Sequence, residues 1–147
     1  MRQERRYICF DSIINHIDNY KCLSNSIDCI VGIARGGVIP ATMFAYKLNI
    51  KEIYFTQLSS YDKDNKQTTL YEKVPLSVSH IIDKRVLFVD DIADTGHTLN
   101  HIKDFYSRYT KDSKFYTCVY KQKSTFKPDF YGEIVDDDTW VEFPWEI

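Results

Sequence analysis

The segment Val86–Leu99 reads VLFVDDIADTGHTL and combines a run of apolar residues with two adjacent carboxylates and a hydroxyl-rich loop. The apolar run, Val86–Val89, has the length and composition of a strand covered on both faces, which is typical of parallel sheets packed between helices. Ligands of open α/β sheets bind beyond the carboxyl ends of the strands. The segment therefore predicts an α/β fold whose binding site begins directly after this strand.

The residues that follow the strand have the chemistry of a phosphate and ribose site. Asp90 and Asp91 can accept hydrogen bonds from sugar hydroxyls or bind a metal ion. The next segment enters a helix, whose free N–H groups and positive dipole end favour an anion. It contains Asp94, Thr95, Gly96, His97 and Thr98. We predict that this turn binds a phosphate, with the two threonine hydroxyls as additional donors.

Two other structures could contain part of this pattern. An ordinary strand-to-helix turn with Asp94 as N-cap accounts for Asp94 and Gly96 but leaves the pair of Asp90 and Asp91 unexplained. A phosphoacceptor receiver domain also has paired acidic residues, at the end of its first strand, and most of its fold follows that strand. Here the pair lies beyond the middle of the chain, which argues against a receiver domain.

The composition bounds the class of protein. The 147 residues carry 19 basic and 21 acidic side chains, a formal net charge of −2, so nothing demands nucleic acid or an anionic membrane as a partner. The N-terminal segment MRQERRYICF lacks the apolar core of a signal peptide, and no apolar run is long enough to span a bilayer. We predict one domain, residues 1–147, in the cytoplasm.

Alternating strand and helix patterns along the chain predict a parallel sheet with right-handed crossovers. The expected strands are Cys29–Ala34, Ile53–Ser60, Val86–Asp90, Phe115–Tyr120 and Glu133–Val135. The expected helices have core residues at Ile13, Ile14, Ile17, Tyr20 and Leu23, within Ile39–Leu48, and at Leu99, Ile102, Phe105, Tyr106 and Tyr109. The polar stretch Tyr61–Glu72 is expected to form a long excursion or a hairpin.

A second loop between a strand and a helix, Gly32–Ala41, reads GIARGGVIPA. Gly36 and Gly37 allow backbone N–H groups to approach an anion closely, and Arg35 supplies a positive charge. We interpret Arg35, Gly36 and Gly37 as a pyrophosphate-binding loop. A plain tight turn with the same Arg-Gly-Gly sequence is the alternative.

The order of apolar strand, Asp90-Asp91, Ile-Ala and Asp94-Thr-Gly-x-Thr resembles the phosphoribosyl pyrophosphate (PRPP) motif of type I phosphoribosyltransferases. The Arg-Gly-Gly loop resembles the pyrophosphate loop of the same family. The resemblance implies the type I phosphoribosyltransferase fold, a central parallel sheet flanked by helices with a small hood and a mobile loop. It also implies a cis peptide bond at Ala34–Arg35.

Two further segments resemble bacterial xanthine-guanine phosphoribosyltransferase. Segment 138–146, DTWVEFPWE, is similar to its base pocket. The resemblance implies that Trp140 stacks on a purine and that Val141 offers backbone groups. It further implies that Glu142 lies near the substituent at position 2 and that Lys121 reaches O6.

Segment 58–65, LSSYDKDN, is similar to the start of the mobile loop of that enzyme. The implied loop residues are Ser59, Ser60, Tyr61, Lys63 and Lys66. The arginine that relatives place near the start of this loop is absent, which leaves Lys63, Lys66 and Gln67 as alternatives for a pyrophosphate contact.

The implied reaction transfers the 5-phosphoribosyl group of PRPP to a purine base, either guanine, xanthine or hypoxanthine. Mg²⁺ is the implied cofactor, held together with the ribose hydroxyls by Asp90 and Asp91, and Asp94 is the implied general base near purine N7. A homodimer or homotetramer is expected.

Two other classes of function stay open. One is a non-catalytic regulator that binds PRPP or nucleotides, against which the lack of a basic stripe argues, and the other is an assembly subunit, suggested by the 15% aromatic content.

Overall fold

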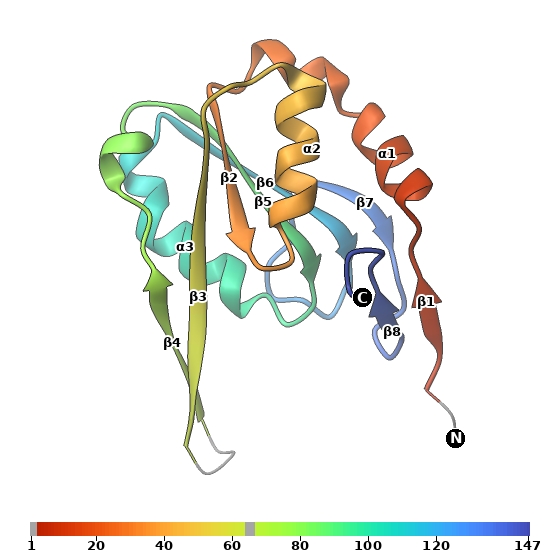
Figure 1. The fold of residues 1–147 in the computed structure, drawn as a ribbon. Coiled ribbons are helices and arrows are strands. Elements are labelled where there is room, and N and C mark those ends of the chain that lie inside the picture. Colours follow the sequence, from red (N-terminus) through yellow and green to blue (C-terminus); the bar gives the residue numbers. More distant parts are fainter. Residues whose placement is uncertain (1–2, 64–66) are drawn as a thin grey trace.

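Six strands form the central sheet, in the order β4-β3-β2-β5-β6-β7 (Figure 1). The computed structural model describes residues 3–63 and 67–147. The strands are β2 (Cys29–Ala34), β3 (Ile53–Lys63), β4 (Gln67–Val74), β5 (Arg85–Ala93), β6 (Asp112–Tyr120) and β7 (Phe130–Ile134). Neighbouring strands run parallel except β3 and β4, which form an antiparallel hairpin. The α/β fold with a mostly parallel sheet is confirmed.

Helices cover both faces of this sheet (Figure 1). They are α1 (Phe10–Asp18), α2 (Val38–Leu48) and α3 (His97–Tyr106), with short 3₁₀ turns η1 (Lys21–Asn25), η2 (Val78–His80) and η3 (Ser107–Tyr109). Buried residues of α1 and α2 form one core cluster with Leu87 and Val89 of β5. Those of α3 form the other with Val86 and Phe88. The side chains of Val86–Val89 are all fully buried, so this part of β5 is covered on both faces, as the sequence predicted.

A second sheet of two strands lies next to β7 in Figure 1. Here β1 (Arg5–Tyr7) pairs in parallel with β8 (Trp140–Glu142), and Arg5 lies opposite Trp140. Ile8 and Val141 join the core cluster on the side of α1 and α2, which anchors this sheet to the body of the protein. The small sheet matches the hood that the resemblance implied, although the sequence patterns predicted neither of its strands.

Two segments differ from the expected boundaries. β5 continues beyond Asp90 to Ala93 and stays paired with β6, so Asp91 also lies inside the strand and not after it. Of the stretch 61–72, residues 61–63 and 67–72 belong to the arms of the β3–β4 hairpin, the second of the two expected forms. Its residues 64–66 lie outside the described part of the chain.

The predicted helical faces are correct in part. Ile13, Ile17, Leu99, Ile102 and Tyr106 are buried. Ile14 and Phe105, also expected in the core, are 44% and 38% exposed. Each follows or precedes a buried residue directly, and a step of one residue turns a side chain toward the flank of a helix. Among the described residues, no helix is both long and apolar enough to cross a membrane.

An ion pair joins the starts of the two central strands. Arg85, the first residue of β5, donates from Nη2 to Asp28 Oδ1 at 2.8 Å and from Nε to Asp28 Oδ2 at 3.1 Å. The backbone N–H of Arg85 donates to the same Oδ2 at 2.7 Å, and the Asp28 N–H donates to the Arg85 carbonyl at 2.7 Å. The hydrogen bonds from Arg85 lower the pKa of Asp28 to about 2.

We expect Asp28→Asn to destabilise the fold in a pH-dependent way. Because the pKa of Asp28 is depressed in the folded state, its stabilisation is fully present above the ordinary value of 3.8 and is lost as the pH falls toward 2. The urea midpoints of the wild type and the variant should differ most above about pH 5 and converge as the pH falls toward 2. A constant difference over that range would contradict this role of the ion pair.

Candidate functional site

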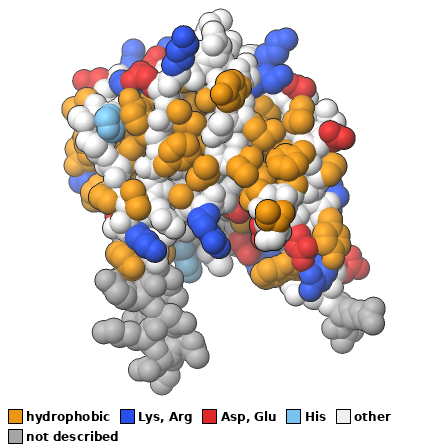
Figure 2. Space-filling model, in the orientation of Figure 1, with side chains coloured by type: hydrophobic (Ala, Val, Ile, Leu, Met, Phe, Trp, Pro, Cys, Tyr) orange, Lys and Arg blue, Asp and Glu red, His pale blue; other side chains and the backbone are white. Residues whose placement is uncertain are grey.

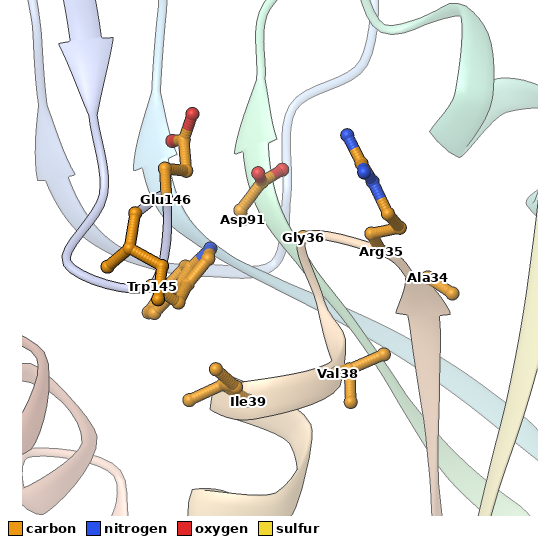
Figure 3. Close-up of a pocket in the computed structure, with 9 residues that line it drawn as sticks. Ala34, Arg35, Gly36, Val38, Ile39, Asp91, Trp145 and Glu146 are labelled. Carbon is orange, nitrogen blue, oxygen red and sulfur yellow. The ribbon is translucent and has the colours of Figure 1, made fainter.

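The carboxyl ends of β2, β5 and β6 meet at one edge of the molecule. This edge is at the bottom of Figure 1, and Figure 2 shows that it is hollowed, with acidic side chains in the hollow. A cavity of about 650 Å³ lies there, between the loop after β2, the end of β5 and the C-terminal segment (Figure 3). Residues that line it are Ala34, Arg35, Gly36, Val38, Ile39, Asp91, Trp145 and Glu146.

Asp90 and Asp91 form a pair of carboxylates with little access to water. Asp90 is 9% exposed, and its Oδ1 accepts a hydrogen bond from the Asp91 N–H at 2.8 Å. Burial raises the pKa of Asp90 well above its usual value, and the charge of Asp91 raises it further. Burial also raises the pKa of Asp91, and the charge of Glu146 in the same cavity adds to the effect (Figure 3). A cation or a hydroxyl donor would stabilise the charged forms of both groups.

The loop after β2 packs tightly against this pair. A Cβ atom at Gly36 would lie 2.0 Å from Asp91 Oδ2, and one at Gly37 would lie 2.2 Å from the Val89 carbonyl oxygen. The Gly37 N–H donates to the Ile33 carbonyl at 2.8 Å. This amide is therefore occupied by the fold itself, which corrects the expectation that it is free to bind an anion. Close packing requires glycine at both positions, and binding of pyrophosphate by this loop stays a prediction.

The start of α3 and the end of β5 enclose a smaller cavity of about 220 Å³. Its lining residues are Asp90, Asp91, Ile92, Asp94, Thr95, Gly96, His97, Thr98 and Leu99. Gly96 is the N-cap of α3 with a φ of 90°, and a Cβ atom there would lie 2.6 Å from the Phe126 nitrogen, so the position requires glycine. The His97 N–H donates to Thr95 Oγ1 at 3.3 Å. The structure thus gathers the whole helix-entry segment beside the acidic pair.

Two lysines from the loop after β6 face Asp94. Lys121 Nζ lies 3.7 Å and Lys123 Nζ lies 3.1 Å from the same atom, Asp94 Oδ1. The Lys121 side chain is 7% exposed, and its backbone N–H donates to the Ala93 carbonyl at 3.0 Å. The structure therefore brings Lys121 and Asp94 together, two residues that the resemblance assigned to O6 and N7 of the purine. Lys123 was missed, because a lysine in a polar loop gives no signal of its own.

The hood contributes an exposed aromatic ring. Trp140 is 52% exposed, which suits a ring that stacks on a ligand better than a core tryptophan. The Val141 side chain is buried in the core, so only its backbone groups are left for a ligand. Glu142 forms an ion pair with Arg5 of the neighbouring strand, a contact that the sequence analysis did not anticipate. The carboxylate of Glu142 therefore already has a positive partner.

Sequence reasoning also missed the part that the C-terminal segment has in the cavity. Trp145 stacks on Phe143 with ring centroids 5.0 Å apart, and Glu146 Oε1 accepts a hydrogen bond from the Phe143 N–H at 2.9 Å. In Figure 3 the side chains of Trp145 and Glu146 lie across the cavity from Arg35. The peptide bond Ala34–Arg35 is cis, as the resemblance implied. For the C-terminal segment, the sequence offered only the run Phe-Pro-Trp-Glu at residues 143–146, and this composition favours core packing over a place in a binding cavity.

The residues expected in a mobile loop are described only in part. Ser59 lies in β3, and the backbones of Ser60, Tyr61 and Lys63 are paired with β4. Lys66 lies outside the described residues. The mobility of this loop stays a prediction.

Comparisons with known proteins show what this chain is similar to. The model of the phosphoribosyl transferase domain matches residues 3–147. A xanthine-guanine phosphoribosyltransferase of Cereibacter sphaeroides is 31% identical over 118 residues, which cover 80% of this chain and 68% of that protein.

Two solved structures share the whole architecture. A purine phosphoribosyltransferase from Pyrococcus horikoshii superposes with a TM-score of 0.85 and 28% identity, over 97% of this chain and 95% of that chain. A Neisseria gonorrhoeae protein with bound ppGpp superposes with a TM-score of 0.79 and 25% identity, over 100% of this chain and 92% of that chain.

We expect Gly36→Ala to displace the Asp91 carboxylate and to leave the sheet intact. The added methyl group would overlap Asp91 Oδ2, and rotation of one side chain costs less than movement of two packed segments. A crystal structure of the variant should show the Asp91 carboxylate in a different rotamer, with β2 and β5 unchanged. An unmoved Asp91 beside the new methyl group would contradict the packing argument.

Proposed function

The chain belongs to the phosphoribosyl transferase domain family, and we propose that it transfers the 5-phosphoribosyl group of PRPP to a 6-oxopurine base in purine salvage. The products are the nucleoside monophosphate and pyrophosphate. One observation carries the proposal. The pair of Asp90, which is buried, and Asp91, which is half-buried, lies between a helix N-terminus and a cavity that Arg35 lines. The helix N-terminus, the two carboxylates and Arg35 thus follow one another in the same order as the 5′-phosphate, the ribose and the pyrophosphate of PRPP.

The chain's own residues would bind PRPP at three places. The turn of residues 94–98 would hold the 5′-phosphate, because it combines hydroxyls with the N-terminus of α3. Asp90 and Asp91 would accept hydrogen bonds from the ribose hydroxyls, which relieves the cost of their burial. Arg35, whose side chain lines the larger cavity, would pair with the pyrophosphate (Figure 3).

We propose Mg²⁺ as the cofactor, with Asp90 and Asp91 as its protein ligands. The pair fits a divalent cation because burial raises the pKa of both carboxyls, and a positive ion would favour their charged forms. Within residues 3–63 and 67–147, no three His, Cys, Asp or Glu side chains gather as a metal site, so substrate oxygens and water would complete the coordination. When bound, the ion would neutralise charge on the leaving pyrophosphate.

The base would lie between the hood and the loop after β6. Lys121 would donate to purine O6, and Asp94, which faces it, would exchange a proton near N7. The exposed ring of Trp140 would stack on the purine, and the backbone of Val141 would offer hydrogen bonds. Glu142 would lie near position 2 together with its partner Arg5.

The difficult event is rupture of the anomeric C–O bond, which passes through an oxocarbenium-like transition state. The two carboxylates would stabilise the positive charge that develops on the ribose ring. Arg35 would hold the departing pyrophosphate, and the β3–β4 hairpin would exclude the water that could hydrolyse PRPP. We further expect a homodimer or homotetramer, and, from the sequence, a location in the cytoplasm.

The names of the relatives support this reaction, since they are xanthine-guanine and purine phosphoribosyltransferases. The Neisseria protein with bound ppGpp favours a second candidate, a protein of the same fold that binds a nucleotide without catalysis. One assay separates the two. The protein is incubated with PRPP, Mg²⁺ and each of guanine, xanthine, hypoxanthine and adenine, and the nucleotides are identified by chromatography. Absence of a nucleoside monophosphate with every base would reject the enzyme.

Replacement of both carboxylates, Asp90→Asn with Asp91→Asn, should abolish transfer without loss of stability. We expect kcat/KM to fall by at least about 10²-fold, because ribose and metal contacts are lost together. The thermal midpoint should stay equal or rise, because two buried carboxyls with raised pKa are replaced by neutral groups. Excess chelator should likewise stop the wild type. Near-normal turnover of the double variant would reject this site.

Lys121 should make the enzyme reject adenine. Adenine carries an amino group where 6-oxopurines carry an acceptor, so its N–H would face the lysine ammonium, and discrimination can reach about 10⁴-fold. Lys121→Ala should lower kcat/KM for hypoxanthine by about 10- to 100-fold and shrink the preference over adenine. Trp140→Ala is the matched control, since loss of stacking should weaken all bases alike. Comparable turnover of adenine by the wild type would overturn the role of Lys121.

A further inference from the structure

The Asp94 side chain is shielded at one oxygen and open to solvent elsewhere. Its Oδ1 atom is shielded from solvent and accepts no regular hydrogen bond from the described residues. The groups that balance its charge are the two ammonium groups, Lys123 Nζ at 3.1 Å and Lys121 Nζ at 3.7 Å. The Asp94 side chain as a whole is nevertheless 45% exposed. Part of this side chain therefore reaches solvent although Oδ1 does not.

The position of Lys123 relative to Asp94 is set by the backbone. Three hydrogen bonds tie the loop 121–125 to the loop 93–95: Lys121 N–H to the Ala93 carbonyl at 3.0 Å, Thr125 N–H to the Thr95 carbonyl at 2.9 Å, and Thr125 Oγ1 to the same carbonyl at 2.9 Å. On its other side, the Lys123 N–H donates to Asp137 Oδ1 at 3.1 Å. These bonds anchor the backbone from which the Lys123 side chain extends, and that side chain, 45% exposed, reaches Asp94 from the solvent side.

Lys121 meets two demands in the proposed reaction. It must donate to purine O6, and it also faces the Asp94 carboxylate. A charged pair with little access to water is stronger than a hydrogen bond to a neutral carbonyl oxygen. If Lys121 alone balanced Asp94, its ammonium would be drawn away from the base. Lys123 lies closer to Asp94 Oδ1 and can balance that charge instead.

We propose that Lys123 is a positioning residue for recognition of the purine base. It holds Asp94 Oδ1, which leaves the Lys121 ammonium free for O6. Lys123 itself does not touch the base. The inference rests on the proposed function, because it assigns Lys123 to the base site of that reaction.

Steady-state kinetics with hypoxanthine, PRPP and Mg²⁺ test this role in three variants of the full chain. Lys123→Met should raise the KM for hypoxanthine about tenfold and leave the KM for PRPP unchanged. Lys123→Arg should restore most of the wild-type KM, because it retains the positive charge. Lys127→Met is the matched control, since it removes the same charge from an exposed position beyond this loop and should have no effect. An unchanged KM for hypoxanthine in Lys123→Met would overturn the proposal.

A double-mutant cycle separates this role from a general loss of charge or of folding. Binding of inosine monophosphate, which requires no turnover, is measured by calorimetry for the wild type, Lys123→Met, Lys121→Ala and the double variant. If Lys123 acts by freeing Lys121, Lys123→Met should weaken binding in the wild type and have little effect in the Lys121→Ala background. An equal loss in both backgrounds would reject the inference. Failure of the wild type to form any nucleotide would instead reject the proposed function.

Discussion

The complete burial of β5 on both faces is the constraint on which the rest of the structure depends. Val86–Val89 are closed in by helices on each side, so the charged groups of this strand can lie only at its two ends. At the start, Arg85 is matched by Asp28 within the protein. At the other end, Asp90 and Asp91 are close together and burial raises the pKa of both. The charge at the start of the strand is thus balanced within the protein, whereas the two carboxylates near its other end are left for a ligand.

The buried strand and its loop could be predicted because local composition determines them. Val86–Val89 is apolar in every position, and Gly96 is needed by the backbone where the helix begins. The hood could not be predicted in this way. All three residues of β1, Arg5–Tyr7, are exposed, and Arg5 finds its partner Glu142 across a sequence separation of 137. The position of Lys123 could not be predicted from the sequence either, since its place beside Asp94 follows from hydrogen bonds between two loops that are distant in the chain.

The glycines show a requirement that local reasoning did not find. The sequence suggested that Gly36 and Gly37 bring amides to an anion, which stays a prediction for the loop, and the structure adds that both positions lack space for a side chain. At Gly36 the carboxylate of Asp91 occupies the volume of a side chain, and at Gly37 the carbonyl of Val89 does so. The loop after β2 can therefore approach β5 closely enough for Arg35 and Asp91 to line one cavity. A sequence pattern does not distinguish conformational freedom from close packing, because glycine serves both.

The pairing of β1 with β8 has a consequence for the order in which the molecule assembles. The hood joins residues near the two ends of the chain, with contacts across 135 and 137 positions, while β5 and its neighbours join much shorter separations. Closing such a long loop is entropically costly, and the hood offsets that cost with three backbone residue pairs and the burial of Ile8 and Val141. It should therefore form last and open first among the elements of the fold. Opening of this kind would move Trp140, so the element expected to open first would also be the wall through which a purine enters the base site.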